Sequence, residues 1–288
     1  TREQYLSSQL QSAVPYPYCG IWQAGLICNS NTTLYALLDG YPQFSDVTLL
    51  DNWGDSIFHA FTFKARRRFG RSLTVLAGYT FSKLLDNNIG NGTRTGADGG
   101  SSNVQDWDNL RLERAVSVLN VPHRLVTTVL YNFPAMKSHS RLVRHLFGSW
   151  QANGTLTLQS GNSIGVTTSA GGKLYAGSRP NLIGNPKPAQ QTIDHWLEAS
   201  AFTVAAERSP GNGPRNLPAL QSDGLQSLTM SLLKNIRLSE RWRMQVRMAA
   251  NNVTNTPTFG QPGAGLGSAT FGVVSTAVSA PRRIQFGL

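Results

Sequence analysis

The chain has 288 residues and a formal net charge of +11, yet only 14% of its residues are charged. This fraction lies well below the roughly 25% that is usual in soluble domains, and the abundant Gly, Ser, Thr and Asn suit strands joined by long loops. No run of about eighteen apolar residues is present and the mean hydropathy is -0.23, which excludes a helical membrane protein.

The positive charge raises the question of nucleic-acid binding, and the placement of the basic residues argues against it. They are scattered, and many alternate with apolar neighbours, as do Lys64, Arg66 and Arg68 and the basic residues of 241–247. No recognition helix or RNA-binding motif accompanies them. The pattern favours basic residues in the lumen or at the periplasmic rim of a barrel.

Residues 1–55 are predicted to be mainly loop, with one short strand near residues 47–50, because prolines interrupt them and no alternation is sustained. The start lacks the charged and apolar regions of a secretory signal, so we expect an export signal upstream and treat the chain as a fragment. Cys19 and Cys28 are close enough to close a small loop, and no zinc-ligand spacing surrounds them. We predict a disulfide formed in an oxidising compartment, with two unpaired thiols as the alternative.

A β-hairpin is predicted over residues 56–84, where two runs of alternating side chains meet at a short turn. In the first arm Phe61 and Phe63 share one face, and Lys64 and Arg66 share the other. Each arm runs for about a dozen residues, whereas strands are usually about five to six residues long. A strand that crosses a bilayer at a tilt needs about 9 to 11 residues, with apolar side chains towards lipid and polar ones towards a lumen. The hairpin therefore predicts two transmembrane strands.

Five further strands are predicted over residues 123–133, 149–160, 225–237, 241–253 and 282–288. Short or medium connections alternate strictly with long ones, and in outer-membrane barrels the short turns are periplasmic and the long loops extracellular. The predicted fold class is all-β: an incomplete antiparallel transmembrane barrel of about seven or eight long strands. Because bacterial single-chain barrels have an even number of strands, we expect more strands before Thr1.

The motifs that would indicate catalysis or a metal site lack their structural context. Residues 161–165 match the G-x-S-x-G nucleophile elbow, but no helix is predicted after the serine. The histidines show neither i, i+4 pairing nor Cys or carboxylate partners at ligand spacing. The alternating glycines of 263–267 lack the strand-to-helix setting of a dinucleotide site. We predict no enzyme activity, no cofactor and no metal.

Two sets of polar residues are candidate contacts of a ligand or the lumen. The first set lies in the long connection after Leu84 and consists of Asp106, Trp107, Asp108, Arg111 and Arg114. Salt bridges between loops are the favoured alternative for this set, because charge clusters in loops are usually structural or solvated. The second set is predicted to face the lumen and consists of Lys64, Arg66, Arg124, Arg243 and Arg247. These strand-face cations would steer an anionic substrate or bind a plug domain.

Eight motifs follow one another along nearly the whole chain. They are YPQF at 41–44, GDSIFHAFTFKARRRF, LTVLAGYTFSK, NLRLERAVSVLNVPHRLVTTVLYNFP, GSWQANGTLTLQSG, SRPNLIGNP, LQSLTMSLLKNIRLSERWRMQVRMAANNVTNTPTFG and PRRIQFGL. Each is loose by itself, but this order resembles the C-terminal barrel portion of Oar-like TonB-dependent receptors. The chain differs from that family at Leu288, where the last strand would continue to a terminal aromatic residue read by the barrel-assembly machinery.

The resemblance implies a large barrel, commonly of about twenty-two strands, filled by an N-terminal plug and energised through a TonB box. In the Oar-like branch a carboxypeptidase-regulatory-like domain precedes the plug. Neither domain is expected within this chain, so residues 1–288 are interpreted as the C-terminal part of one barrel domain, with 1–55 mainly loop and 56–288 strands and loops.

The leading hypothesis is an outer-membrane receptor that binds an unidentified ligand and takes it up with energy from a TonB-type protein, which it reaches through the missing N-terminal region, or that acts in surface export and adhesion. Its other expected partners are outer-membrane lipid and the barrel-assembly machinery, with no nucleic acid, and the barrel is expected to be monomeric. One alternative is a structural or adhesive outer-membrane barrel without transport. A third is a soluble all-β protein that binds or acts on carbohydrate.

Overall fold

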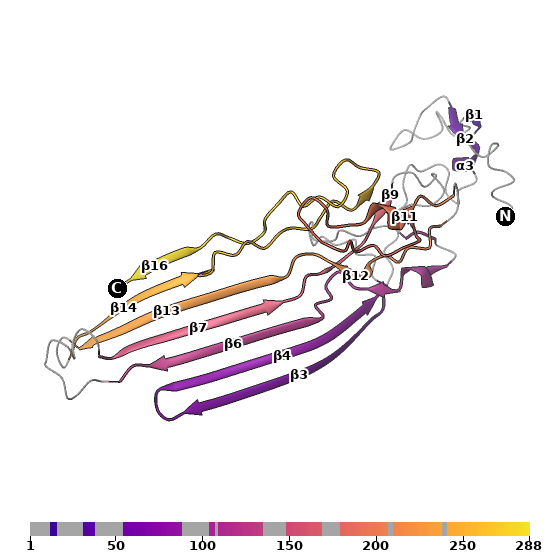
Figure 1. The fold of residues 1–288 in the computed structure, drawn as a ribbon. Helices are drawn as coiled ribbons and strands as arrows, with labels where there is room; N and C mark the ends of the chain where they lie inside the picture. Colours follow the sequence, from indigo (N-terminus) through magenta and orange to yellow (C-terminus); the bar gives the residue numbers. More distant parts are fainter. Residues whose placement is uncertain are drawn as a thin grey trace, which may run out of the picture.

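Seven strands form one antiparallel sheet and follow each other across it in chain order. The computed structural model describes residues 12–15, 31–37, 54–87, 104–106, 109–134, 148–168, 179–206, 210–237 and 241–288. The seven strands, called the wall strands here, are β3 (Ser56–Phe69), β4 (Leu73–Asp86), β6 (His123–Asn132), β7 (Trp150–Gln159), β13 (Leu225–Arg237), β14 (Arg243–Asn251) and β16 (Arg283–Gly287). Each pairs with the next, and the sheet stays open along β3 and β16 (Figure 1). The predicted all-β meander of long strands is confirmed.

The register joins side chains of the same kind across the sheet. Phe61 lies opposite Phe81, and Phe63 lies opposite Tyr79. One complete row runs through Phe69, Leu73, Tyr131, Ala152, Leu232, Met248 and Phe286. Because side chains alternate with period two, a slip of one residue would move a whole strand's apolar set to the other face. The sheet therefore has one apolar face and one polar face, as the alternation predicts.

The connections between wall strands separate by length to the two ends of the sheet (Figure 1). The short or medium connections span 70–72, 133–149 and 238–242, and the long ones span 87–122, 160–224 and 252–282. We call the end of the sheet that carries the long connections the loop end. The predicted strict alternation of short and long connections is confirmed.

The long connections contain short elements of their own, where the sequence predicts little besides loop. They are η1 (Leu110–Glu113), β5 (Ala115–Val116), β8 (Ser163–Ile164), β9 (Thr167–Thr168), β10 (Asn181–Leu182), η2 (Ala199–Ala201), β11 (Phe202–Thr203), β12 (Leu217–Gln221) and β15 (Gly265–Leu266). β5 pairs with β4, β12 with β8, β11 with β10, and β15 runs parallel to β9. Except for β12, these strands have only two residues and carry no detectable alternation, which is why the sequence pattern missed them.

The hydrophobic core lies at the loop end and not in the sheet. Its buried members are Ile164, Val166, Leu197, Ala201, Phe202, Leu217 and Leu220. Leu266 and Phe271 of the last long connection pack against them. Two long connections thus share one core, and the loop end is a folded body.

The N-terminal part of the structure is described only in two pieces. β1 (Ala13–Pro15) pairs with β2 (Asn31–Thr33), and α3 (Leu34–Leu37) follows. The strand predicted near residues 47–50 and the predicted disulfide of Cys19 and Cys28 lie outside the described residues. Within the described ranges, no helix is both long and apolar enough to span a bilayer.

Candidate functional site

Hydroxyl and amide side chains bond to one another across the polar face of the sheet. The Thr128 and Thr155 hydroxyls lie 3.2 Å apart, and the Thr62 and Thr80 hydroxyls lie 3.4 Å apart. Ser231 donates to the Asn153 side chain at 2.6 Å. Cross-strand pairs of this kind stabilise a sheet while leaving its polar face hydrated. This face is suited to a water-filled interior.

The polar face also carries the second set of sequence-predicted residues. Lys64 and Arg66 belong to β3, Arg124 to β6, and Arg243 and Arg247 to β14, and the register places all five on this face. Each side chain is exposed. Among the residues with described side chains, the register also places Arg68 and Arg283 on this face, as the alternation in the sequence predicts.

Aromatic side chains gather near both ends of the apolar face. Near the loop end the Tyr79 hydroxyl lies 2.8 Å from Nδ1 of His123, whose ring also packs near Phe81. At the other end Tyr131 packs edge-on against Phe133, with ring centroids 4.8 Å apart. Tyr131 pairs with Leu73, which lies eight positions before Phe81 on β4. About 27 Å of strand therefore lies between the two aromatic groups. With a strand tilt this spacing is comparable with an apolar belt about 25 Å tall flanked by aromatic girdles.

The cations of the apolar face lie close to these girdles. The Lys234 ammonium sits 4.7 Å from the centroid of the Trp150 ring, and the Arg67 guanidinium 5.6 Å from that of Phe69. An aromatic face attracts a cation at such distances. The positions suit the boundary between an apolar layer and water.

A buried ion pair fastens two long connections together at the loop end. The Arg179 guanidinium donates two bonds of 3.0 Å to the Glu113 carboxylate, and the side chains are 2% and 0% exposed respectively. Arg179 Nε also donates to the Gln105 side chain at 2.9 Å, and Gln105 donates to the Gly211 carbonyl. A two-pronged bond between guanidinium and carboxylate fixes orientation as well as distance. Residues 105–113 and 179–211 therefore hold each other in place.

Arg215 fastens the same body to the wall. Its guanidinium contacts the Asp86 carboxylate at the end of β4 and donates to the Glu113 carbonyl at 3.2 Å. The next residue, Asn216, donates to the Val116 carbonyl at 2.9 Å. The sequence analysis missed these buried partners, because nothing local marks an arginine whose carboxylate is more than a hundred residues away.

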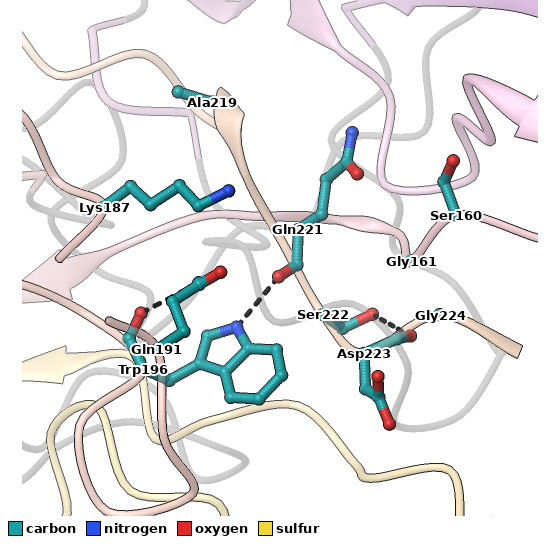
Figure 2. Close-up of a pocket in the computed structure, with 10 residues that line it drawn as sticks. All are labelled: Ser160, Gly161, Lys187, Gln191, Trp196, Ala219, Gln221, Ser222, Asp223 and Gly224. Atoms are coloured by element: carbon teal, nitrogen blue, oxygen red, sulfur yellow. Dashed lines mark hydrogen bonds between the residues drawn. The ribbon is translucent and has the colours of Figure 1, made fainter. Parts of the chain in front are cut away.

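An open cavity of about 310 Å³ lies where β7 ends and β13 begins (Figure 2). Its lining is mostly polar and includes Lys187, Gln191, Gln221 and Asp223, with Trp196 as the large ring. The Trp196 indole donates to the Gln221 carbonyl at 2.9 Å, and Gln191 donates to the Trp196 carbonyl at 3.2 Å. These bonds hold the ring in one orientation beside the cavity.

The cavity is bordered by a close crossing of two backbone segments. A Cβ atom added to Gly161 would lie 1.8 Å from the Ser222 carbonyl oxygen, and one added to Gly224 would lie 2.6 Å from that of Gln159. Only glycine permits such an approach. The exit of β7 and the entry of β13 are thus fixed against each other at this point.

Comparison with known proteins agrees with this architecture. A family model described as an outer membrane beta barrel domain matches residues 3–285. The chain belongs to this family. No curated protein and no solved structure matches it. The protein is accordingly an outer-membrane protein, and the apolar face of its sheet is the face that such barrels turn to lipid.

Membership of the outer membrane beta barrel family removes the soluble carbohydrate protein from the candidate functions. A soluble sandwich would cover the apolar face of its sheet with a second sheet. Here large side chains on that face stay exposed, such as Phe61 at 64% and Phe286 at 78%. Lipid is the solvent that makes this exposure favourable.

The described members of the first set of predicted contacts, Asp106, Arg111 and Arg114, lie in the long connection at the loop end, where the Arg114 N–H donates to the Arg111 carbonyl at 3.2 Å. Arg114 pairs with Asp55 at 3.0 Å on the surface, Arg111 is exposed, and Asp106 is half-buried. Trp107 and Asp108 lie outside the described residues. The neighbouring Glu113 is held in the buried pair with Arg179.

The serine of the G-x-S-x-G match lies in a short buried strand. It is Ser163 of β8, which is 1% exposed. Among the described residues no group of three or more His, Cys, Asp or Glu side chains could hold a metal ion.

Proposed function

We propose that this chain is the barrel part of a TonB-dependent receptor of the Oar-like group. In this proposal it binds a ligand at the loop end and passes it through the lumen with energy delivered by a TonB-type protein. The polar face of the wall strands lines that lumen, and the protein acts by binding and passage without covalent chemistry, cofactor or metal.

One structural observation favours a receptor over a barrel that is only structural. The long connections fold into a body with its own core, a buried ion pair and an open polar cavity. A barrel that only spans the membrane does not need long connections that fold into such a body. The order of eight motifs resembling Oar-like receptors supports the same proposal.

The proposed partners follow from this role. They are outer-membrane lipid against the apolar face, the barrel-assembly machinery during insertion, and a TonB-type protein in the periplasm. We propose a monomeric barrel formed by a single domain to which residues 1–288 contribute. In the first predicted set, Asp106 and Arg111 are proposed contacts of the ligand.

A structural or adhesive barrel is the second candidate, because a folded loop end also suits attachment to a surface. Energy coupling separates the two. The gene product, expressed in full from its native locus, is photo-cross-linked in living cells and tested for adducts with the TonB-type protein. We expect an adduct that a protonophore changes in yield. Cells in which the receptor reaches the outer membrane but forms no adduct would leave adhesion as the function.

A further inference from the structure

The wall strands carry many cations and almost no carboxylates. Across all seven strands the sequence contains one acidic residue, Asp86, and Arg215 holds its carboxylate at the loop end. The basic residues on the polar face with described side chains are Lys64, Arg66, Arg68, Arg124, Arg243, Arg247 and Arg283. All are exposed, and within the described part of the chain none of them forms an ion pair.

The register concentrates six of these seven cations in two strips. Three of them follow each other on β3 at alternate positions, and three more lie on β14 and β16 at the opposite edge. Alternate residues of a strand lie about 7 Å apart, so like charges repel within each strip. Between the strips β7 and β13 present hydroxyl and amide groups such as Thr155 and Ser231. The polar face thus has two basic margins, with hydroxyl and amide groups and the single cation Arg124 of β6 between them among the described side chains.

We propose that this face is an anion-binding surface and that the solute it takes is a polyvalent anion bearing phosphate or carboxylate groups. Guanidinium groups bind such oxyanions through two parallel bonds, and the hydroxyl groups between the strips supply further donors. Inside a barrel, low-dielectric walls concentrate the field and raise the local concentration of anions. The inference rests on the proposed lumenal placement of the polar face and needs no energy coupling.

Cysteine labelling in isolated outer membranes that contain the full-length protein tests the proposal. Cys19→Ser and Cys28→Ser, together with serine at any cysteine of the full-length protein outside residues 1–288, leave Gln245→Cys as the single thiol, between Arg243 and Arg247 on the polar face. Its labelling rates by a sulfonate methanethiosulfonate and by a trimethylammonium methanethiosulfonate are compared, with 2-mercaptoethanol as the reference thiol. A positive potential of one kT per unit charge raises the ratio of anionic to cationic rates about sevenfold. We expect a rise of at least this size.

Three further measurements make the result specific. Arg243→Gln together with Arg247→Gln should return the rate ratio most of the way to the reference. Inorganic tripolyphosphate, the probe for binding, should slow the labelling of Gln245→Cys in the parent and lose this effect in the double variant. Met248→Cys, on the apolar face of the same strand, should react with neither reagent.

Several results would overturn the proposal. A rate ratio equal to that of the reference thiol means that an acidic segment of the same protein already neutralises the wall. A raised ratio without protection by tripolyphosphate means that the wall attracts anions and does not bind them. A Gln245→Cys that labels no faster than Met248→Cys places this face away from water. None of these measurements involves TonB, so a missing TonB adduct would remove energised transport and leave the anion site intact.

Discussion

The loop end buries apolar and basic side chains of the kinds that the wall leaves exposed. On the wall strands the described large apolar residues are exposed or half-buried, whereas at the loop end Ile164 and Leu220 are 0% exposed. Ala250 alone among the buried hydrophobic residues of the described chain lies in a wall strand. The basic residues show the same contrast, since those of the wall's polar face are exposed, whereas Arg179 and Arg215 at the loop end are buried and paired.

This contrast shows two solvents acting on one chain. Lipid replaces a protein core for the wall, so its apolar side chains need no partner layer and its strands need only backbone pairing and alternation. The loop end meets water and must form a core of its own, as a small soluble domain does. Substitutions should therefore have different costs in the two regions.

The largest effect is expected at the buried ion pair of the loop end. Glu113→Ala leaves the Arg179 guanidinium buried without its carboxylate, which should destabilise the loop end by about 3 to 5 kcal/mol. Hydrogen exchange of peptides from 104–120 and 179–216 in the full-length protein measures the free energy of local opening. Asp55→Ala is the matched control, because it breaks the exposed pair with Arg114 and should cost about 1 kcal/mol or less. Equal losses of free energy in the two variants would contradict a buried ion pair that stabilises the folded loop end.

The next effect tests the lipid-facing side of the wall. Ala77→Arg puts a charge near the middle of the apolar face and should lower the free energy of unfolding by about 2 to 4 kcal/mol. Guanidinium titration of the protein in phospholipid vesicles, followed by tryptophan fluorescence, measures the change. Gly78→Arg is the control on the opposite face, where an added Cβ meets nothing within 4 Å. A similar loss in both variants would contradict the assignment of faces.

A smaller effect is expected where the two regions join. Gly161→Ala would place a Cβ against the Ser222 carbonyl, and overpacking of this kind typically costs about 1 to 3 kcal/mol. The same titration measures it. Gly154→Ala within β7 provides the comparison, because its added Cβ would lie at an ordinary 3.8 Å from the Met230 side chain. If Gly161→Ala is the better tolerated of the two, the close crossing beside the cavity is not rigid.

The smallest effect separates the two faces of a single strand. Thr128→Val removes the hydroxyl contact with Thr155 on the polar face and should cost about 0.2 to 1 kcal/mol. Thr127→Val makes the same change on the apolar face, beside Ala77 and Leu156, where losing a hydroxyl should be neutral or stabilising in lipid. Unfolding titrations of the two variants side by side give the difference. A larger loss for Thr127→Val would exchange the assigned faces.

The wall strands can be predicted from the sequence because their side chains alternate along the chain with period two. Alternation with period two identifies β3 and β4, assigns Phe63 and Lys64 to opposite faces, and places Arg247 on the polar face without knowledge of any distant contact. The expectation of an outer-membrane barrel follows from strand length and from the alternation of short and long connections. The same rule places Arg68 and Arg283 on the polar face.

The loop end needed the tertiary structure because its order arises from distant contacts. Glu113 and Arg179 are 66 positions apart, and Asp86 and Arg215 are 129 positions apart. The segments that join them are rich in Gly, Pro and Asn and carry no periodic pattern, so their sequence resembles that of plain loops. By itself the sequence determined the strands, their two faces and the end at which the long connections lie. Which arginine meets which carboxylate, and where a cavity opens between them, was decided only when packing brought the long connections together.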